Sequence, residues 1–147
     1  MKVAIVNGSA RENGNSHHAA KFVEETILSK WPDAIVAKIN LSELNIHPCM
    51  GDAWCRRNDE CLQDDDMKWI INLLDDCDFT VFISPVFFRD MSSLMKIFTD
   101  RLSLKKELIV QTVQLPPQLL RPELTKKANM TSKVRTLNTL MSLMRRF

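Results

Sequence analysis

Strand-like and helix-like segments alternate along residues 1–102, and few folds accommodate such an order. Short runs of β-branched and other apolar residues predict buried strands. These runs are residues 2–7, 34–39 and 79–83. Elsewhere apolar residues recur at helical spacing and predict amphipathic helices. These segments are residues 20–31, 67–74 and 91–102. The alternation predicts an α/β domain on a doubly wound parallel sheet.

Capping residues and prolines mark the expected ends of these elements. Asn15 or Ser16 is expected to cap the first helix, and Pro32 to end it. The acidic run Asp64–Asp66 is expected to cap the second helix, and Ser84–Pro85 to end the third strand. With the strand order 2-1-3, the loops after the first and third strands are neighbours. Ligands of doubly wound sheets bind at such carboxyl ends, so we expect both loops to line one pocket.

Length and charge narrow the class of protein. A chain of 147 residues fits one domain, and no apolar run is long enough to span a bilayer. Residues 1–103 carry 11 Lys and Arg against 16 Asp and Glu, whereas residues 104–147 carry 9 against 2. This asymmetry disfavours a uniformly basic nucleic-acid binder. We expect a cytoplasmic protein that contacts neither nucleic acid nor membrane.

The loop after the first predicted strand concentrates glycine and hydrogen-bond donors. Two of the three glycines of the chain, Gly8 and Gly14, bound this loop. A strand, a glycine-bounded loop and a helix N-terminus form an anion cradle of backbone amides. The spacing matches neither the Walker A loop nor the dinucleotide fingerprint. A phosphate site without metal fits the donors, and a capped turn with a surface arginine is the alternative.

The segment 8–16, Gly-Ser-Ala-Arg-Glu-Asn-Gly-Asn-Ser, resembles the phosphate loop of the NADPH-dependent FMN reductase family, which has a flavodoxin-like fold. Segments 45–51, 64–67, 84–88 and 94–101 resemble further landmarks of this family in the same order, so the resemblance covers about residues 1–103. It implies a flavodoxin-like doubly wound parallel sheet of order 2-1-3-4-5.

The resemblance also implies a cofactor and its site. Ser9, Arg11, Asn15 and Ser16 would hold the FMN phosphate. The flavin ring would lie along the second loop. The residues of this loop are Pro85, Val86, Phe87 and Phe88. Hydride would pass from NAD(P)H to the flavin, so we name no catalytic side chain.

Two departures from the family pattern concern the second loop, called the ring loop below, and the cysteines. The ring loop usually presents an aromatic residue, often Tyr, followed by small residues, but here it continues as Phe87-Phe88-Arg89-Asp90. Cys49, Cys55 and Cys61 resemble the cysteine motif of the related iron-sulfur flavoproteins, with Asp52 in place of one cysteine. We expect no cluster, because a cubane cluster normally takes four thiolates. A weakly held cluster or zinc is the alternative.

A third departure lies in residues 104–147, which contain no glycine where the family has a glycine-containing flavin loop. We expect one strand near residues 107–115 and a basic amphipathic helix, so that the sheet is incomplete or finished by a partner chain. An open sheet edge needs a cover, and a homodimer is the simplest one.

These patterns lead to one preferred function and two alternatives. We expect an FMN-binding, NAD(P)H-dependent oxidoreductase that reduces a small acceptor such as a quinone, a nitro compound or a flavin. The first alternative is a flavin or iron-sulfur electron-transfer protein without nicotinamide turnover. The second is a non-catalytic, truncated flavodoxin-like domain.

Overall fold

A computed structural model describes residues 1–102 of the protein. The strand expected near residues 107–115 and the basic helix after it lie outside the described residues, as do the fourth and fifth strands of the flavodoxin-like order. None of the described helices is both long and apolar enough to cross a membrane.

Three parallel strands form the central sheet. They are β1 (Lys2–Asn7), β2 (Ile35–Asn40) and β3 (Phe79–Ile83). Their order is β2-β1-β3, which confirms the predicted 2-1-3 arrangement. Val3 of β1 lies beside Val36 on one side and Phe79 on the other. The central position of β1 explains its continuous apolar run, because a strand between two neighbours and two covered faces is buried, as β1 is from Val3 to Asn7.

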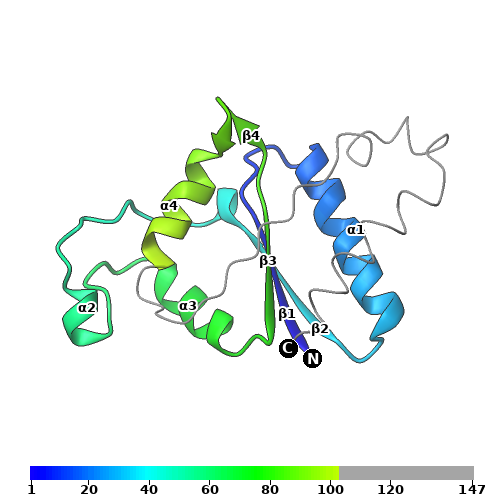
Figure 1. Ribbon diagram of the computed structural model, residues 1–147, viewed down its shortest axis with the longest axis horizontal. Helices are drawn as coiled ribbons and strands as arrows, with labels where there is room; N and C mark the ends of the chain where they lie inside the picture. Colours follow the sequence, from blue (N-terminus) through cyan, green and yellow to red (C-terminus); the bar gives the residue numbers. More distant parts are fainter. Residues whose placement is uncertain (103–147) are drawn as a thin grey trace. The chain divides into compact units, whose positions relative to one another are not determined.

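Helices cover both faces of this sheet (Figure 1). The helix α1 (Asn15–Lys30) lies on one face, and α3 (Met67–Asp75) and α4 (Ser93–Arg101) lie on the other. The connection from β2 to α3 contains a short 3-10 helix, η1 (Leu41–Glu43), and the single turn α2 (Cys55–Asn58). The three predicted helices are therefore present and produce a layered α/β architecture.

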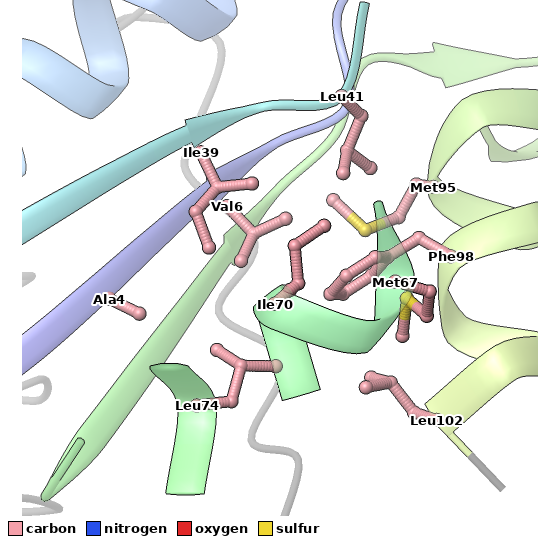
Figure 2. Packing of buried hydrophobic residues seen from close by; sticks show 10 residues of the cluster. All are labelled: Ala4, Val6, Ile39, Leu41, Met67, Ile70, Leu74, Met95, Phe98 and Leu102. Atoms are coloured by element: carbon pink, nitrogen blue, oxygen red, sulfur yellow. The ribbon is translucent and has the colours of Figure 1, made fainter. Parts of the chain in front are cut away.

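The larger part of the core lies between the sheet and the two helices α3 and α4, and Figure 2 shows its residues. Alternate residues of β1, Ala4 and Val6, point into this layer, whereas Val3 and Ile5 point to the face that α1 covers. The helices contribute apolar residues at i, i+3, i+4 and i+7 spacing. The buried ones are Met67, Ile70, Leu74, Met95 and Phe98. The Phe98 ring meets Phe82 of β3 edge to face, with centroids 5.9 Å apart.

The start of α1 differs from the prediction, whereas the start of α3 agrees with it in part. Gly14, and not Asn15 or Ser16, occupies the N-cap of α1, and this N-cap offers no side-chain hydrogen bond. Asp66 occupies the N-cap of α3 without capping it through its side chain. Asp65 of the same acidic run does cap this helix, because its carboxylate accepts from the Met67 amide at 3.1 Å.

A β-hairpin that the sequence did not predict follows β3. It consists of β4 (Val86–Phe87) and β5 (Asp90–Met91), paired antiparallel. Its turn residues, Phe88 and Arg89, have positive φ values of 49° and 69°. The predicted helical segment began at Met91, which is two residues too early, because Met91 belongs to β5 and α4 begins at Ser93.

Candidate functional site

The loops after β1 and β3 lie at the same end of the sheet (Figure 1). β1 and β3 are neighbours, and the Gly8 amide donates to the Ile83 carbonyl at 2.8 Å directly beyond the paired strands. The two loops adjoin as expected, and the pocket that they were expected to line together stays a prediction. A ligand at this edge can therefore contact residues from both.

Ser9 organises the first loop from a buried position. Its Oγ donates to the Arg11 carbonyl and accepts from the Arg11 amide, each at 3.2 Å. Its own amide donates to the side-chain oxygen of Asn7 at 3.1 Å. Ser9 therefore shapes the bend with its hydroxyl group, and Asn7 is a part of the site that sequence reasoning missed.

The N-terminus of α1 faces this loop, and within the described residues no side chain caps it. The carbonyl of Gly14 accepts from the amides of His17 and His18, whereas the first amides of a helix have no acceptor within it. Acidic residues are absent from the first turn, so nothing there offsets the partial positive charge of the helix end. Ser16 is buried at this end and Asn15 is exposed.

Arg11 adds a full positive charge beside the open helix end. Its side-chain methylenes run along Gly14, where an added Cβ would lie 3.3 Å from the Arg11 Cδ. No carboxylate within residues 1–102 pairs with its guanidinium, and the side chain is exposed. The first loop thus brings together Ser9, Arg11, Asn15 and Ser16 as predicted, in an arrangement suited to an oxyanion.

Ser92 joins the second loop to the first. Its hydroxyl group donates to the Gly8 carbonyl at 2.7 Å and accepts from the Met95 amide at 3.2 Å, which caps α4. The amide of Ser92 donates to Ser84 Oγ at 3.0 Å. Gly8 lies so close to α4 that an added Cβ would come within 2.9 Å of the Met95 Cβ. The two loops are therefore held in fixed contact.

The predicted ring-binding residues lie on the second loop and its hairpin. Pro85 is half-buried beside β3, whereas Val86, Phe87 and Phe88 are 73%, 60% and 104% exposed. They present an apolar surface that nothing within residues 1–102 covers. Exposed aromatic groups at positive φ are uncommon, because that backbone conformation is strained for a non-glycine residue.

The cysteines of the β2–α3 connection are placed differently from the ligands of a metal centre within the described residues. Within residues 1–102, no three His, Cys, Asp or Glu side chains are placed so that they could hold one metal ion. Cys49 is exposed, Cys55 and Cys61 are half-buried, and all are free thiols. The Cys61 sulfur lies 3.4 Å from Nη2 of Arg101. An iron-sulfur cluster does not fit this arrangement of cysteines.

A buried ion pair between Asp65 and Arg101 holds this connection instead. Their side chains are 0% and 1% exposed, and two hydrogen bonds of 2.7 and 3.1 Å join them. Arg101 also donates to the His47 carbonyl at 2.9 Å, and Asp65 accepts from the His47 amide at 3.0 Å. The pair therefore fastens residues on both sides of the cysteines to α4. Sequence reasoning missed it.

Burial and pairing act in opposite directions on both groups. Burial raises the pKa of Asp65, but the hydrogen bonds from Arg101 and from the His47 and Met67 amides outweigh it, so the pKa lies below its ordinary value. Burial lowers the pKa of Arg101, and Asp65 reverses the effect, so the net direction is upward. Both groups are thus charged near neutral pH. Burial also raises the pKa of the half-buried Cys77 thiol, which packs against the core as predicted.

Comparisons with known proteins agree with this geometry. The sequence model of the NADPH-dependent FMN reductase family matches residues 1–116. An iron-sulfur flavoprotein of Clostridioides difficile is 30% identical over 102 residues, which are 69% of this chain and 45% of that protein. An iron-sulfur flavoprotein of Archaeoglobus fulgidus is 31% identical over 103 residues, 69% of this chain and 46% of that protein. The chain spans about half the length of these relatives.

Solved structures have the same fold. A flavone reductase matches with a TM-score of 0.52 and 25% identity, over 71% of this chain and 31% of the other. An azoreductase of Bacillus anthracis matches with a TM-score of 0.57 and 16% identity, over 69% of this chain and 55% of the other. At that identity the azoreductase is evidence for the fold alone.

Proposed function

Because the chain belongs to the NADPH-dependent FMN reductase family, we propose that it binds FMN and transfers electrons from NAD(P)H through it to a small acceptor. The carrying observation is the N-terminus of α1, which no side chain of residues 1–102 caps, with the guanidinium of Arg11 beside it, which pairs with no carboxylate in the same part of the chain. This group of donors adjoins the apolar surface of the second loop. A phosphate and a planar apolar ring are the two ends of FMN.

The first loop supplies the phosphate contacts in this proposal. The amides of Asn15 and Ser16 and the Ser16 hydroxyl group donate hydrogen bonds to a phosphate at the helix end, and Arg11 contributes the charge. Ser9 keeps the bend in shape through its bonds to Arg11. No metal is needed, because backbone amides and a guanidinium together balance a phosphate.

The second loop supplies the ring contacts. Pro85 and the hairpin residues Val86, Phe87 and Phe88 offer apolar surface, and Ser92 keeps this loop against Gly8. Bound FMN supplies the hydride and electron chemistry. The protein binds and orients the flavin and keeps water from one face of its ring. We assign no side chain the role of a general acid or base.

We also propose that the acceptor is a small molecule such as a quinone, a nitro compound or a flavin, and that the protein acts in the cytoplasm. Four free cysteines support a reducing compartment. The preference between NADH and NADPH depends on contacts to the nicotinamide nucleotide, and the experiment below measures both.

The test combines binding and turnover on the full chain. We expect FMN to raise the thermal midpoint of the purified protein, because at about 100 times its Kd a ligand adds about 2.7 kcal/mol to the free energy of unfolding. We further expect steady oxidation of NADH or NADPH with menadione as acceptor. Arg11→Gln should weaken FMN binding and leave riboflavin binding unchanged, because only FMN carries the phosphate.

Each contrary outcome identifies a different alternative. FMN binding without oxidation of NADH or NADPH would favour the alternative of an electron-transfer protein. A chain that folds but gains no stability from FMN would favour the alternative of a non-catalytic domain. An equal loss of FMN and riboflavin binding in Arg11→Gln would place the phosphate elsewhere.

A further inference from the structure

Asn7 is a buried polar residue at the end of an otherwise apolar strand. It follows Val3, Ala4, Ile5 and Val6 in β1 and is 1% exposed. A buried side-chain amide costs free energy unless hydrogen bonds satisfy it, so an apolar residue would be the ordinary choice here. The contacts of Asn7 explain why an amide occupies this position.

Each end of the Asn7 amide contacts a different part of the site. Its Oδ1 accepts from the Ser9 amide at 3.1 Å, two residues further along the chain. Its Nδ2 lies 3.1 Å from Nδ1 of His17 in the first turn of α1, and 3.5 Å from the Asn40 side-chain oxygen at the end of β2. One side chain thereby connects the bend, the helix end and the neighbouring strand.

From these contacts we infer that Asn7 is a positioning residue that sets the shape of the phosphate loop, and with it the selectivity for a phosphorylated flavin. The inference rests on the proposed function. The bond to the Ser9 amide directs Ser9, whose hydroxyl group fixes both backbone groups of Arg11. Asn7 therefore acts on the phosphate through Ser9 and Arg11 without touching it.

This role differs from a general contribution to stability. Within residues 1–102, the Asn7 side chain forms no hydrogen bond with the second loop, whose position depends on Ser92 and Ser84. Loss of the Asn7 acceptor should displace the phosphate donors and leave the ring surface in place. The affinity for FMN then falls, while the affinity for riboflavin, which has the same ring and no phosphate, stays the same.

Two variants of nearly equal shape isolate the acceptor. Asn7→Val suits a buried strand and removes every hydrogen bond of the amide. Asn7→Thr has almost the same volume and keeps a hydroxyl oxygen, which can accept from the amide two residues later as Ser and Thr do in turns. Val3→Ala serves as a control, because it creates a cavity at the far end of the same strand and does not touch the loop.

The experiment measures the Kd of FMN and of riboflavin for the full-length wild type and the three variants by quenching of flavin fluorescence. We expect Asn7→Val to weaken FMN binding about five- to tenfold relative to riboflavin, the range of one lost hydrogen bond. Asn7→Thr should retain most of the wild-type ratio, and Val3→Ala all of it. Circular dichroism at the same temperature verifies that each variant is folded.

Three results would overturn the inference. Asn7→Val could weaken FMN and riboflavin binding by the same factor, or it could leave both affinities unchanged. Asn7→Thr could also weaken FMN binding as much as Asn7→Val does. A wild-type chain without preference for FMN over riboflavin would refute the proposed phosphate site itself, and this is known before any variant is measured.

Discussion

Gly8 and Gly14 bound the same loop for different physical reasons. Gly8 has no room for a side chain, because an added Cβ would approach the Met95 Cβ to 2.9 Å and the Ser92 Oγ to 3.0 Å. At Gly14, a Cβ would meet only the flexible Arg11 side chain. Gly14 has an ordinary extended φ of −90°, so it does not use the conformational freedom of glycine. Its lack of a side chain instead leaves the helix amides open.

The two glycines provide a matched pair of substitutions. We expect Gly8→Ala to lower the free energy of unfolding by about 1–3 kcal/mol, the usual cost of overpacking. Gly14→Ala should cost about 1 kcal/mol or less, because only the N-cap preference of glycine over alanine is lost. Urea unfolding of both variants measures the difference. Equal costs would mean that α4 moves away from Gly8 easily.

At the scale of elements, the connection from β2 to α3 is long and has little regular structure, yet both of its ends are fixed. Asp66 accepts from the Asn45 amide at 2.7 Å, and the Asp65–Arg101 pair joins the same region to α4. Asp65 and Asp66 therefore hold the β2–α3 connection in place, in addition to preceding α3.

Removal of one partner from this buried pair should be more costly than removal of both. We expect Arg101→Met to destabilise the protein by about 3–5 kcal/mol, because it leaves the Asp65 carboxylate buried and unpaired. The double variant Asp65→Asn with Arg101→Met should recover part of this loss. Urea unfolding at neutral pH compares the two. A double variant that is less stable than Arg101→Met would contradict the expectation.

The lowered pKa of Asp65 also predicts how its contribution depends on pH. Its pKa in the folded protein lies below the ordinary value of 3.8, so the carboxylate contributes stability above pH 3.8. That contribution is lost as the pH falls through the lower folded value, because the folded state must then take up a proton. The difference in the free energy of unfolding between wild type and Asp65→Asn should become smaller as the pH falls below 3.8. A gap that widens in acid would show that the pKa is raised.

At the scale of the whole molecule, apolar surface remains uncovered within the described residues. The outer edges of β2 and β3 have no paired strand within residues 1–102, and the hairpin exposes Phe87 and Phe88. Unpaired edges and exposed aromatic groups favour association. We propose that in a homodimer a second copy of the chain packs against the part of the hairpin that the flavin ring leaves free.

Sedimentation velocity tests this proposal across a wide range of protein concentration. We expect the wild type to sediment as a dimer and Phe88→Ser to shift toward the monomer, because it removes the most exposed aromatic side chain. Trp31→Ser, at the opposite end of α1 from the first loop, serves as the control and should not change the distribution. A monomeric wild type, or a dimer unaffected by Phe88→Ser, would refute the proposal.

The sequence by itself determined the layers of the described domain, and the strand order that the family resemblance implied placed its two ligand-facing loops side by side. Strand and helix periodicities are local, and the handedness of parallel crossovers leaves few arrangements. The family resemblance added the candidate residues for FMN, and their role in binding it stays a prediction.

Only the tertiary structure decided which polar groups meet across long stretches of chain. Ser92 and Gly8 are 84 positions apart, and Arg101 and Asp65 are 36 apart. Asn7 ends an apolar run, and its sequence context does not reveal the amide of Ser9 or the ring of His17 as partners. Such contacts depend on distances of a few ångströms between packed elements, and residue periodicity carries no information about them.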